Sequence, residues 1–405
     1  MNHIYIDKKG KLDRVALLED GDLVEFYKDD VEKSILGNIY RGRVVNVLKG
    51  MSAAFVDIGA QKNGYLYIKD ALSKEQMYNG KTYTIDEVLK NNQQILVQVI
   101  KEPLGSKGVK LTRHISIPSR HMVLTPFSNK VHVSKKIKNP KKLKSLGEEI
   151  IEDGIGVIFR TLAEDVREDI IRSEYKELVN SFYNILKEEN YLPTPKLLYK
   201  EPDSLYTLIR DRYIKGSSQI TSNDKSVLEE IKNSKYFANY NFDNALIYDP
   251  EFSIDYHMDI QRGIKRGFAR RVDLKSGGYI VVDETEALTV IDVNTGSFTG
   301  TLNLKETTLA TNIEAASEIA KQIRLRDIGG IIIVDFIDMK ESESIEKLLG
   351  IMSNEFKNDK NKPYIVDITK LSLVEIVRKK TRPTLDKKSS VLCPTCGGKG
   401  RIRRE

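Results

Sequence analysis

The sequence predicts a multidomain α/β protein, and three observations support this. Two short apolar runs rich in β-branched residues, 287–297 and 329–339, are separated by one helix-length segment. A strand–helix–strand unit of this kind is a right-handed crossover with parallel strands. Residues 35–112 form short alternating strands with glycine turns, a pattern typical of a small β-barrel. With 405 residues, the chain is long enough for two to four domains.

The composition is that of an ordinary soluble protein, with 40% hydrophobic and 30% charged residues. No apolar run approaches the length of a membrane span, and the N-terminus lacks the pattern of a secretory signal. We therefore expect a cytoplasmic protein without membrane contact. The net charge is +7, and seven lysines fall between Lys130 and Lys144 with no acid among them. Such clusters favour a nucleic-acid partner, although a solvated face explains any single cluster equally well.

The N-terminal segment and the region after it both predict β-structure. Residues 14–18 and 23–27 alternate apolar and polar around an Asp-Gly turn, which predicts a hairpin. Strands at 38–47, 53–58, 63–67 and 94–100 belong to a predicted five-stranded OB-fold. Its aromatics Phe55, Tyr65 and Tyr67 could stack on bases, and Phe55 also suits the barrel core. The cations that could line a groove for the nucleic-acid backbone are Arg41, Arg43, Lys49, Lys62 and Lys107.

Residues 117–202 predict a separate α/β block that contains the lysine cluster. The strand at 154–161 ends in Arg160 and Thr161, followed by a helix at 166–190. A guanidinium beside a hydroxyl can clamp a phosphate, but an Arg-Thr pair alone is weak evidence. Residues 203–267 then alternate helix and strand.

Carboxylates at the ends of the two apolar runs predict a metal site. Asp292 is followed in phase by Asn294, and the second run carries Asp335 and Asp338. The helix between them, at 304–325, has its apolar positions at helical spacing. If the strands are neighbours, Asp292 and Asp335 converge, and with an amide oxygen they suit Mg²⁺ or Mn²⁺. The alternative is that each aspartate caps a loop or pairs with a nearby cation, Arg324 or Arg326.

The only two cysteines, Cys393 and Cys396, form one Cys-x-x-Cys followed by a glycine-rich turn. This is half of a zinc knuckle, and structural Zn²⁺ takes four ligands. The simplest completion is a second copy of the chain, with one Zn²⁺ shared across a homodimer. A redox role is less favoured, because the following Gly-Gly-Lys-Gly is a poor start for a helix.

Four sequence runs in the C-terminal half closely resemble the ribonuclease E/G family of bacterial endoribonucleases. They are TEALTVIDVN at 285–294, TNIEAA at 311–316, RLRDIGG at 324–330 and VDFIDM at 334–339. The resemblance extends over essentially the whole chain. At position 119 the chain has serine, which resembles the ribonuclease G branch, whereas the ribonuclease E branch has glycine.

The resemblance implies a fold with five parts. These are an RNase H-like domain split between 1–34 and 204–267, an S1-type OB-fold at 35–117, a 5′-sensor region at 118–203, a DNase I-like catalytic domain at 268–390 and a zinc-link at 391–405. The chain ends nine residues after Cys396, where family members usually continue, so we expect a zinc-linked dimer rather than a tetramer.

The resemblance also implies the roles of individual residues. The catalytic metal ligands fall on Asp292 and Asp335, and Asn294 contacts the scissile region. RNA contacts of the barrel fall on Phe55, Tyr65 and Lys107. The sensor for a 5′-monophosphate falls on Arg160 and Thr161, with Val123 and Ser119 beside them.

The first hypothesis is therefore a metal-dependent endoribonuclease that cuts single-stranded RNA, in rRNA processing and mRNA turnover. Attack by water predicts 5′-phosphate and 3′-hydroxyl products, and the sensor predicts a preference for 5′-monophosphorylated RNA. The alternative is a non-catalytic RNA-binding factor of ribosome assembly, which would not need the carboxylate pair. A DNA nuclease is a third reading, because the fold alone does not fix the substrate.

Overall fold

The computed structural model describes residues 1–9, 12–29, 34–103, 108–191, 193–237, 240–296, 304–398 and 400. The chain divides into two compact units. The first unit contains Met1–Asp30, Gly216–Leu228 and Asn244–Glu405, and the second contains Val31–Lys215 and Glu229–Asp243. Both units are α/β, as predicted, and the two segments of the second are inserted into the first along the chain. The boundaries of the five expected parts stay predictions.

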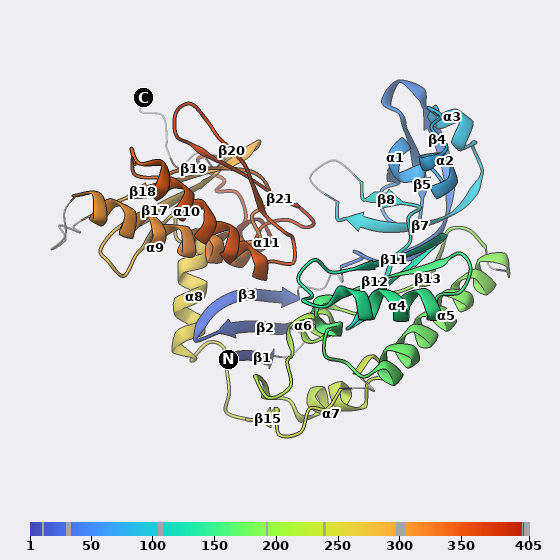
Figure 1. Ribbon diagram of the computed structural model, residues 1–405, viewed down its shortest axis with the longest axis horizontal. Coiled ribbons are helices and arrows are strands. Elements are labelled where there is room, and N and C mark those ends of the chain that lie inside the picture. The colour runs from blue at the N-terminus through green and yellow to red at the C-terminus, as the bar shows by residue number, and fades with distance from the viewer. Residues whose placement is uncertain are drawn as a thin grey trace. The chain divides into compact units, whose positions relative to one another are not determined.

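The first unit begins with a five-stranded sheet in the order β15-β14-β1-β2-β3 (Figure 1). Its strands are β1 (Asn2–Lys9), β2 (Leu12–Glu19), β3 (Asp22–Asp29), β14 (Ser218–Ser222) and β15 (Leu246–Tyr248). The predicted hairpin is β2–β3, and its turn residues Asp20 and Gly21 have φ of 50° and 87°. Two successive positive φ angles give the turn that matches the strand twist, which is why Asp-Gly occurs there.

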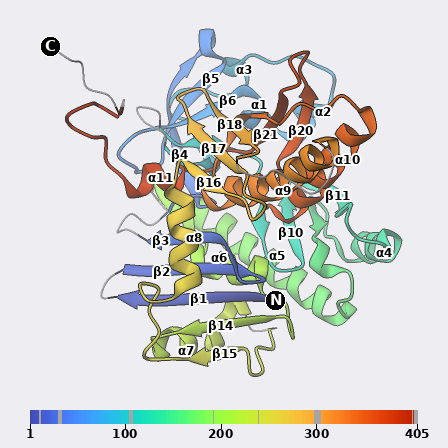
Figure 2. The ribbon, with the colours of Figure 1, turned by 90° about the vertical axis from the view of Figure 1, so that its left-hand side faces the viewer.

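Helix α8 (Met258–Phe268) runs across this sheet (Figure 2). Its Ile260 and Ile264 pack with Leu18 and Leu23 of the hairpin in one apolar core. A Cβ on Gly263 would lie 2.3 Å from the Cβ of Leu23, so the helix approaches the strand more closely than any larger residue allows. The C-terminal part of the unit follows directly after this helix.

A six-stranded sheet in the order β16-β17-β18-β19-β21-β20 forms the second half of the first unit. Its strands are β16 (Arg271–Asp273), β17 (Tyr279–Glu284), β18 (Leu288–Asn294), β19 (Gly330–Asp335), β20 (Tyr364–Ile368) and β21 (Val374–Arg378). Helix α9 (Leu304–Leu325) connects β18 to β19, which lie side by side and parallel. Helices α10 (Ser342–Glu355) and α11 (Leu385–Ser389) complete this half. The predicted crossover is therefore confirmed.

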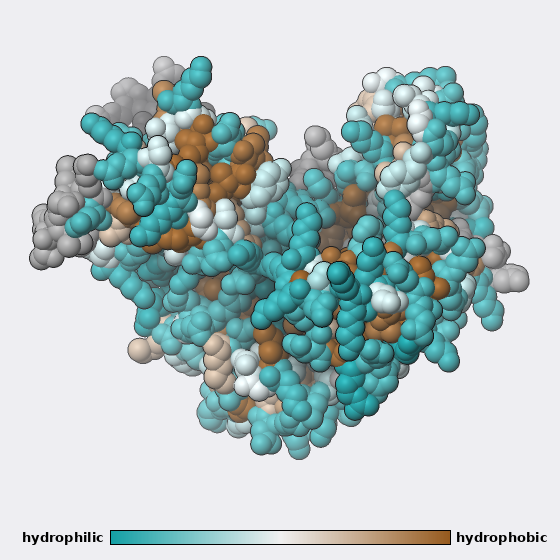
Figure 3. Space-filling view, viewed as in Figure 1, coloured by the Kyte–Doolittle hydropathy of each residue, from teal (hydrophilic) through white to brown (hydrophobic). Residues whose placement is uncertain are grey.

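Helices α9 and α10 pack on one face of this sheet, against Ile291, Ile332 and Val334. The opposite face carries exposed apolar side chains, with Ile331 50%, Tyr364 57% and Val366 51% accessible. Figure 3 shows brown apolar surface over this sheet, among mostly hydrophilic surroundings. The two apolar runs are thus strands with one covered face. β-Branched residues occupy both faces, so alternation could not separate them.

Buried ion pairs connect α9 to the hairpin and hold together the half of the first unit that contains the six-stranded sheet. Arg324 of α9 donates from Nη2 to Glu19 Oε1 at 2.7 Å and to Glu25 Oε1 at 2.8 Å, on the hairpin. Arg378 of β21 pairs with Asp327 at 2.9 Å and with Asp359 at 2.7 Å. Buried charges are costly unless they are paired in this way.

The second unit contains a closed five-stranded barrel, as predicted. Strands β4 (Ile39–Leu48), β5 (Ala53–Asp57), β6 (Gly64–Tyr67), β8 (Lys110–Thr112) and β7 (Gln94–Lys101) pair in that order, and β7 pairs back onto β4. Short helices α1 (Ile68–Ala71), α2 (Lys74–Tyr78) and α3 (Ile85–Val88) lie between the strands, and β13 (Lys196–Tyr199) extends β4. Val44, Val56 and Leu66 fill the interior.

The rest of the second unit is a four-stranded sheet in the order β11-β12-β10-β9. It comprises β9 (Ile117–Pro118), β10 (Met122–Pro126), β11 (Ser128–Val133) and β12 (Ile155–Phe159). Helices α4 (Pro140–Ile150) and α5 (Glu168–Tyr191) share one core with its buried face. Helix α6 (Ser204–Arg212) follows, and α7 (Lys225–Asn233) spans the boundary between the units along the chain. Among the described residues, none of the helices is long and apolar enough to cross a membrane.

Candidate active site

The two predicted carboxylates lie directly beside each other at the end of two parallel strands. Asp292 of β18 and Asp335 of β19 are register partners. Each is the exposed member of an alternating strand, in which Ile291 and Val334 face the helices. Asn294 lies two residues on, and its Nδ2 donates to Asp292 Oδ2 at 2.8 Å. The structure therefore brings all three predicted catalytic residues together on the open face of the sheet.

The site concentrates negative charge. Burial and the neighbouring charges of Asp292 and Asp338 raise the pKa of the Asp335 carboxyl. The alternative pairing with nearby arginines does not occur: Arg324 binds Glu19 and Glu25, and Arg326 donates to backbone carbonyls of α8 and its C-cap. Carboxylates that repel each other, and for which the described residues supply no cationic partner, are suited to bind a cation.

The donor set fits a hard divalent cation. Two carboxylates with an amide nearby are the oxygen ligands that Mg²⁺ and Mn²⁺ prefer, and Mg²⁺ commonly keeps several waters beside one or two carboxylates. Within the described part of the chain, no group of three or more His, Cys, Asp or Glu side chains is arranged to hold a metal. A cation at Asp292 and Asp335 would therefore keep most positions for water and substrate.

Helix α9 holds the loops on both sides of the carboxylate pair. The buried Asn312 donates from Nδ2 to the carbonyl of Ile337 at 2.7 Å and accepts from its N–H at 3.0 Å. Two residues further along the helix, Glu314 accepts from the N–H groups of Lys275 and Ser276. Both residues belong to the TNIEAA run, whose spacing alone gave no indication of this role.

The turn next to Asn294 is closely packed. A Cβ on Gly278 would lie 2.8 Å from the carbonyl oxygen of Asn294, and one on Gly296 would lie 2.3 Å from the carbonyl oxygen of Gly277. Gly296 also has φ of +59°. Both positions therefore require glycine, which fixes the chain as it leaves β18.

On the barrel, two of the three predicted RNA contacts are neighbours. Phe55 of β5 and Tyr65 of β6 are cross-strand partners, and both are partly exposed. They alternate with Val56 and Leu66, which point into the barrel, so the two rings share its outer face. Lys107 lies outside the described residues.

The predicted sensor residues gather at one end of the four-stranded sheet. Arg160 follows β12, and its Nη1 donates to the carbonyl of Ser119 at 2.7 Å. Val123 of β10 pairs with Pro118 and Ile158 on the face opposite the helices. Thr161 is exposed, and its hydroxyl lies 3.0 Å from that of Ser134.

Ser119 is held by hydrogen bonds from both its side chain and its backbone. Its hydroxyl donates to Glu174, and its N–H donates to the carbonyl of Met122 at 2.8 Å. Glu174 also contacts His121 Nδ1 at 2.6 Å. The serine is thereby turned toward α5, and its carbonyl is left for Arg160.

Cys393 and Cys396 form a compact exposed turn with free thiols. The N–H of Gly397 donates to the carbonyl of Cys393 at 2.8 Å, and the N–H of Gly400 donates to Cys396 Sγ at 3.3 Å. Hydrogen bonds from Cys396 and Thr395 lower the pKa of the Cys393 thiol. Backbone donors around both sulfurs suit a thiolate that binds a metal.

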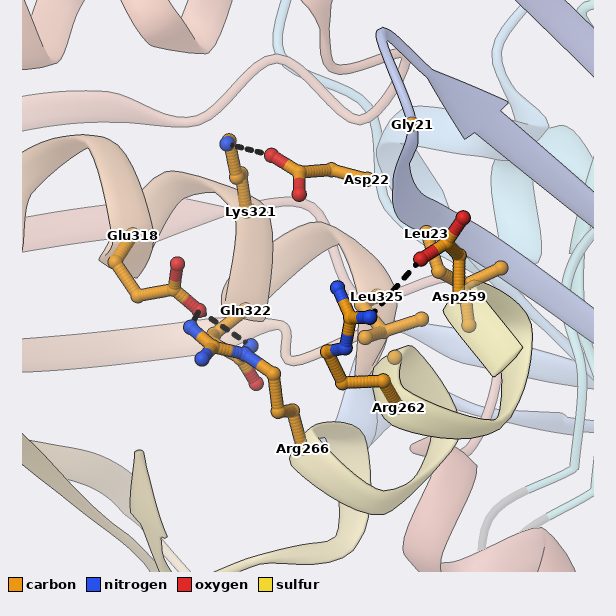
Figure 4. A pocket seen from close by; sticks show the side chains of 11 residues that line it. Gly21, Asp22, Leu23, Asp259, Arg262, Arg266, Glu318, Lys321, Gln322 and Leu325 are labelled. Atoms are coloured by element: carbon orange, nitrogen blue, oxygen red, sulfur yellow. Dashed lines mark hydrogen bonds and ion pairs between the residues drawn. The ribbon is translucent and has the colours of Figure 1, made fainter. Parts of the chain in front are cut away.

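A small pocket of the first unit, of about 40 Å³, lies between the β2–β3 turn and helices α8 and α9 (Figure 4). Its three cations are each paired with a carboxylate: Lys321 with Asp22, Arg266 with Glu318 and Arg262 with Asp259. Because these charges already neutralise one another, the pocket is a poor site for a polyanion. The carboxylate pair remains the candidate active site.

Comparison with known proteins agrees with this picture. The model of the Ribonuclease E/G family matches residues 116–381. Ribonuclease G of Haemophilus influenzae is 37% identical over 401 residues, covering 96% of this chain and 82% of that protein. Ribonuclease G of Escherichia coli K12 is 35% identical over 404 residues, with the same shares covered. Ribonuclease E of Synechocystis is 37% identical over 398 residues, covering 93% of this chain and 58% of that protein. The chain belongs to the ribonuclease E/G family.

Proposed function

We propose that the protein is a metal-dependent endoribonuclease that cuts single-stranded RNA, acting in the cytoplasm on rRNA precursors and mRNA. The observation that carries the proposal is the register pairing of Asp292 with Asp335 on an open sheet face. A pure RNA-binding protein does not need two adjacent carboxylates there. The names of its relatives, ribonucleases G and E, support RNA as the substrate.

In the proposed mechanism, Asp292 and Asp335 would hold a divalent cation, Mg²⁺ or Mn²⁺, through their carboxylate oxygens. Such a cation lowers the pKa of bound water and stabilises charge on a phosphate. Asn294 fixes Asp292 and offers its amide to the scissile phosphate. The oxygen of water attacks phosphorus, the bond to the 3′ oxygen breaks, and that oxygen takes up a proton. The products carry a 5′-phosphate and a 3′-hydroxyl.

The barrel and the sensor would bind the rest of the RNA. Phe55 and Tyr65 present adjacent rings on which successive bases can stack, and each such contact contributes about 1–3 kcal/mol. The family resemblance implies that Lys107 also contacts the RNA. Arg160 and Thr161, with Val123 and Ser119 beside them, would receive a 5′-monophosphate through charge-assisted hydrogen bonds.

The test is cleavage of a single-stranded RNA oligonucleotide with a 5′-monophosphate, in Mg²⁺ and in EDTA, beside its 5′-hydroxyl counterpart. We expect internal cleavage that requires the metal and is faster on the monophosphate. Equal rates on the two RNAs would contradict the proposed sensor but would be consistent with the proposed nuclease activity. Binding without cleavage in either Mg²⁺ or Mn²⁺ would favour the ribosome-assembly alternative.

We further propose that Cys393 and Cys396 bind half of a structural Zn²⁺ site that a second copy of the chain completes. Metal analysis should then find about one zinc per two chains, because structural zinc takes four ligands. Cys393→Ser should lose the zinc and shift the protein from dimer to monomer in light scattering. A zinc-free dimer would contradict this arrangement.

A further inference from the structure

The guanidinium of Arg160, the central residue of the proposed sensor, is held from two sides. Nη1 donates to the carbonyl of Ser119 at 2.7 Å, and Nη2 pairs with Asp211 Oδ1 at 2.8 Å. Its side chain is 27% exposed. A guanidinium has five N–H donors, and the described residues occupy only part of this set. The remaining donors are available to an anion that approaches from solvent.

Asp211, the second support of Arg160, is itself fixed. It is the penultimate residue of α6, and the same Oδ1 accepts from Arg210 Nε at 3.0 Å. Arg210 in turn pairs with Glu201 at 2.8 Å. These side chains form a continuous row of alternating charge, and Asp211, Arg210 and Glu201 are each at most 15% exposed. An aspartate anchored in this way cannot follow Arg160 if the arginine moves.

The charge of Asp211 is shared between two arginines. Burial opposes ionisation, but the charges of Arg210 and Arg160 prevail and lower the pKa of the Asp211 carboxyl, so it is ionised at neutral pH. Because Arg210 takes part of this charge, Asp211 can orient Arg160 without cancelling its attraction for an anion. Fixing a long side chain in advance removes the ordering cost that binding would otherwise carry.

We propose that Asp211 is a positioning residue of the sensor, which holds Arg160 in the orientation that receives a terminal phosphate monoester, the 5′-phosphate of RNA. This inference rests on the proposed function, because it assigns Arg160 to that phosphate. Asp211 does not touch the phosphate. It acts through Arg160, together with the carbonyl of Ser119.

The experiment measures KM and kcat on 5′-monophosphate and 5′-hydroxyl RNA for the wild type, Arg160→Ala, Asp211→Ala and Asp211→Asn. Glu149→Ala, which removes only an exposed ion pair with Arg172 in the same unit, is the matched control. For Asp211→Ala, we expect KM on the monophosphate RNA to rise about tenfold, the loss of one charge-assisted hydrogen bond, with kcat within about twofold. Asp211→Asn keeps an acceptor of the same shape and should fall between this variant and the wild type.

The outcomes separate the inference from the proposed function. If Arg160→Ala loses the preference for monophosphate RNA while both Asp211 variants keep it, the positioning role is overturned and the sensor stands. If the wild type shows no preference, both are overturned. An equal rise of KM on the two RNAs would show a general effect on folding and would also overturn the role. Asp211→Asn keeps the test valid if the alanine variant fails to fold.

Discussion

The chemistry proposed for this protein depends on the direction in which single side chains point. Asp292 and Asp335 occupy matching positions of neighbouring strands, so period-two alternation places both on the face opposite α9. A shift of one residue in either strand would turn its carboxylate into the apolar core. The buried neighbours Ile291 and Val334 fix this register, because they would become exposed in any other.

Replacing either carboxylate should separate catalysis from binding. We expect Asp292→Asn and Asp335→Asn to lower kcat by at least about 10³-fold, because the charge that holds the cation is lost. Affinity for RNA should change less than about threefold, since the barrel and sensor are intact. Cleavage rate and fluorescence anisotropy measure the two properties.

Asp283→Asn is the control for these variants, because Asp283 is an exposed carboxylate of the same sheet that already pairs with Arg270. It should retain cleavage. Parallel loss of binding and cleavage in Asp292→Asn would count against the assignment of the active site.

We expect the neighbouring rings of Phe55 and Tyr65 on the barrel to contribute a measurable part of the affinity for RNA. Phe55→Ala and Tyr65→Ala should each weaken binding of a single-stranded RNA by roughly 1–3 kcal/mol, the value of one base stacked on an aromatic ring. Tyr78→Ala, which removes a 70% exposed ring of α2 in the same unit, is the control. Unchanged affinity of the Phe55 and Tyr65 variants would place the RNA elsewhere.

At the scale of elements, α9 is both the connection between the catalytic strands and the support of their loops. Its apolar side packs under the sheet through Ala316, Ile319 and Ile323. Its N-terminal half presents Asn312 to the loop after β19 and Glu314 to the turn before β17. The geometry of the candidate site therefore depends on a helix that contributes no residue to the carboxylate pair.

Asn312→Ala should leave the backbone groups of Ile337 without their partner. We expect a loss of about 1–3 kcal/mol in the free energy of unfolding, the usual cost of such unsatisfied groups. The loop that carries Asp338 would also lose its anchor, so kcat should fall more than RNA affinity. Thermal unfolding and cleavage kinetics test this.

Ser317→Ala in the same helix removes only a contact with Glu355 at 3.2 Å and serves as the control. If Asn312→Ala retains wild-type stability and kcat, the loop does not depend on this anchor.

At the scale of the whole first unit, buried ion pairs fix segments around the six-stranded sheet and connect α9 to the hairpin. Arg378, 2% exposed, binds Asp327 and Asp359, and Arg324 joins α9 to the hairpin. Burial opposes ionisation of Asp327, but the charges of Arg382 and Arg378 prevail and hold its pKa below the ordinary value. An acid with a depressed folded-state pKa contributes stability above its unfolded pKa, and this stability is lost as pH falls through the folded value.

Arg378→Met should therefore destabilise the protein by roughly 3–5 kcal/mol at neutral pH, because the buried Asp359 loses its ion pair and Asp327 keeps only that with Arg382 among the described residues. This loss of stability, relative to the wild type, should shrink below about pH 4, where protonation of Asp327 removes an ionic contribution from the wild type. Chemical unfolding from pH 7 to pH 3 measures both effects.

Arg172→Met breaks an ion pair whose side chains are 42% and 65% exposed, and it should cost less than about 1 kcal/mol at any of these pH values. If Arg378→Met lowers the free energy of unfolding only slightly, or by an amount that does not change with pH, the ion pairs around Arg378 are not a main source of stability.

The sequence by itself determined the local elements and the identity of the candidate residues. The Asp-Gly hairpin, the short barrel strands and the helix at 304–325 follow from turn chemistry and periodicity, which act over a few residues. The crossover rule also predicted that the strands of Asp292 and Asp335 are parallel, because one helix joins them, and the structure shows that these strands are neighbours.

Only the tertiary structure decided which face of the catalytic sheet is covered, and which polar side chains support the site. Asn312, Asp211 and Glu174 reach partners 25, 51 and 55 residues away in the chain, and no local pattern marks such contacts. The same holds for Arg324, which bonds to the hairpin about 300 residues earlier instead of to a nearby aspartate. Buried polar groups take whatever partners the packed chain brings to them, so their roles appear only once the whole chain is folded.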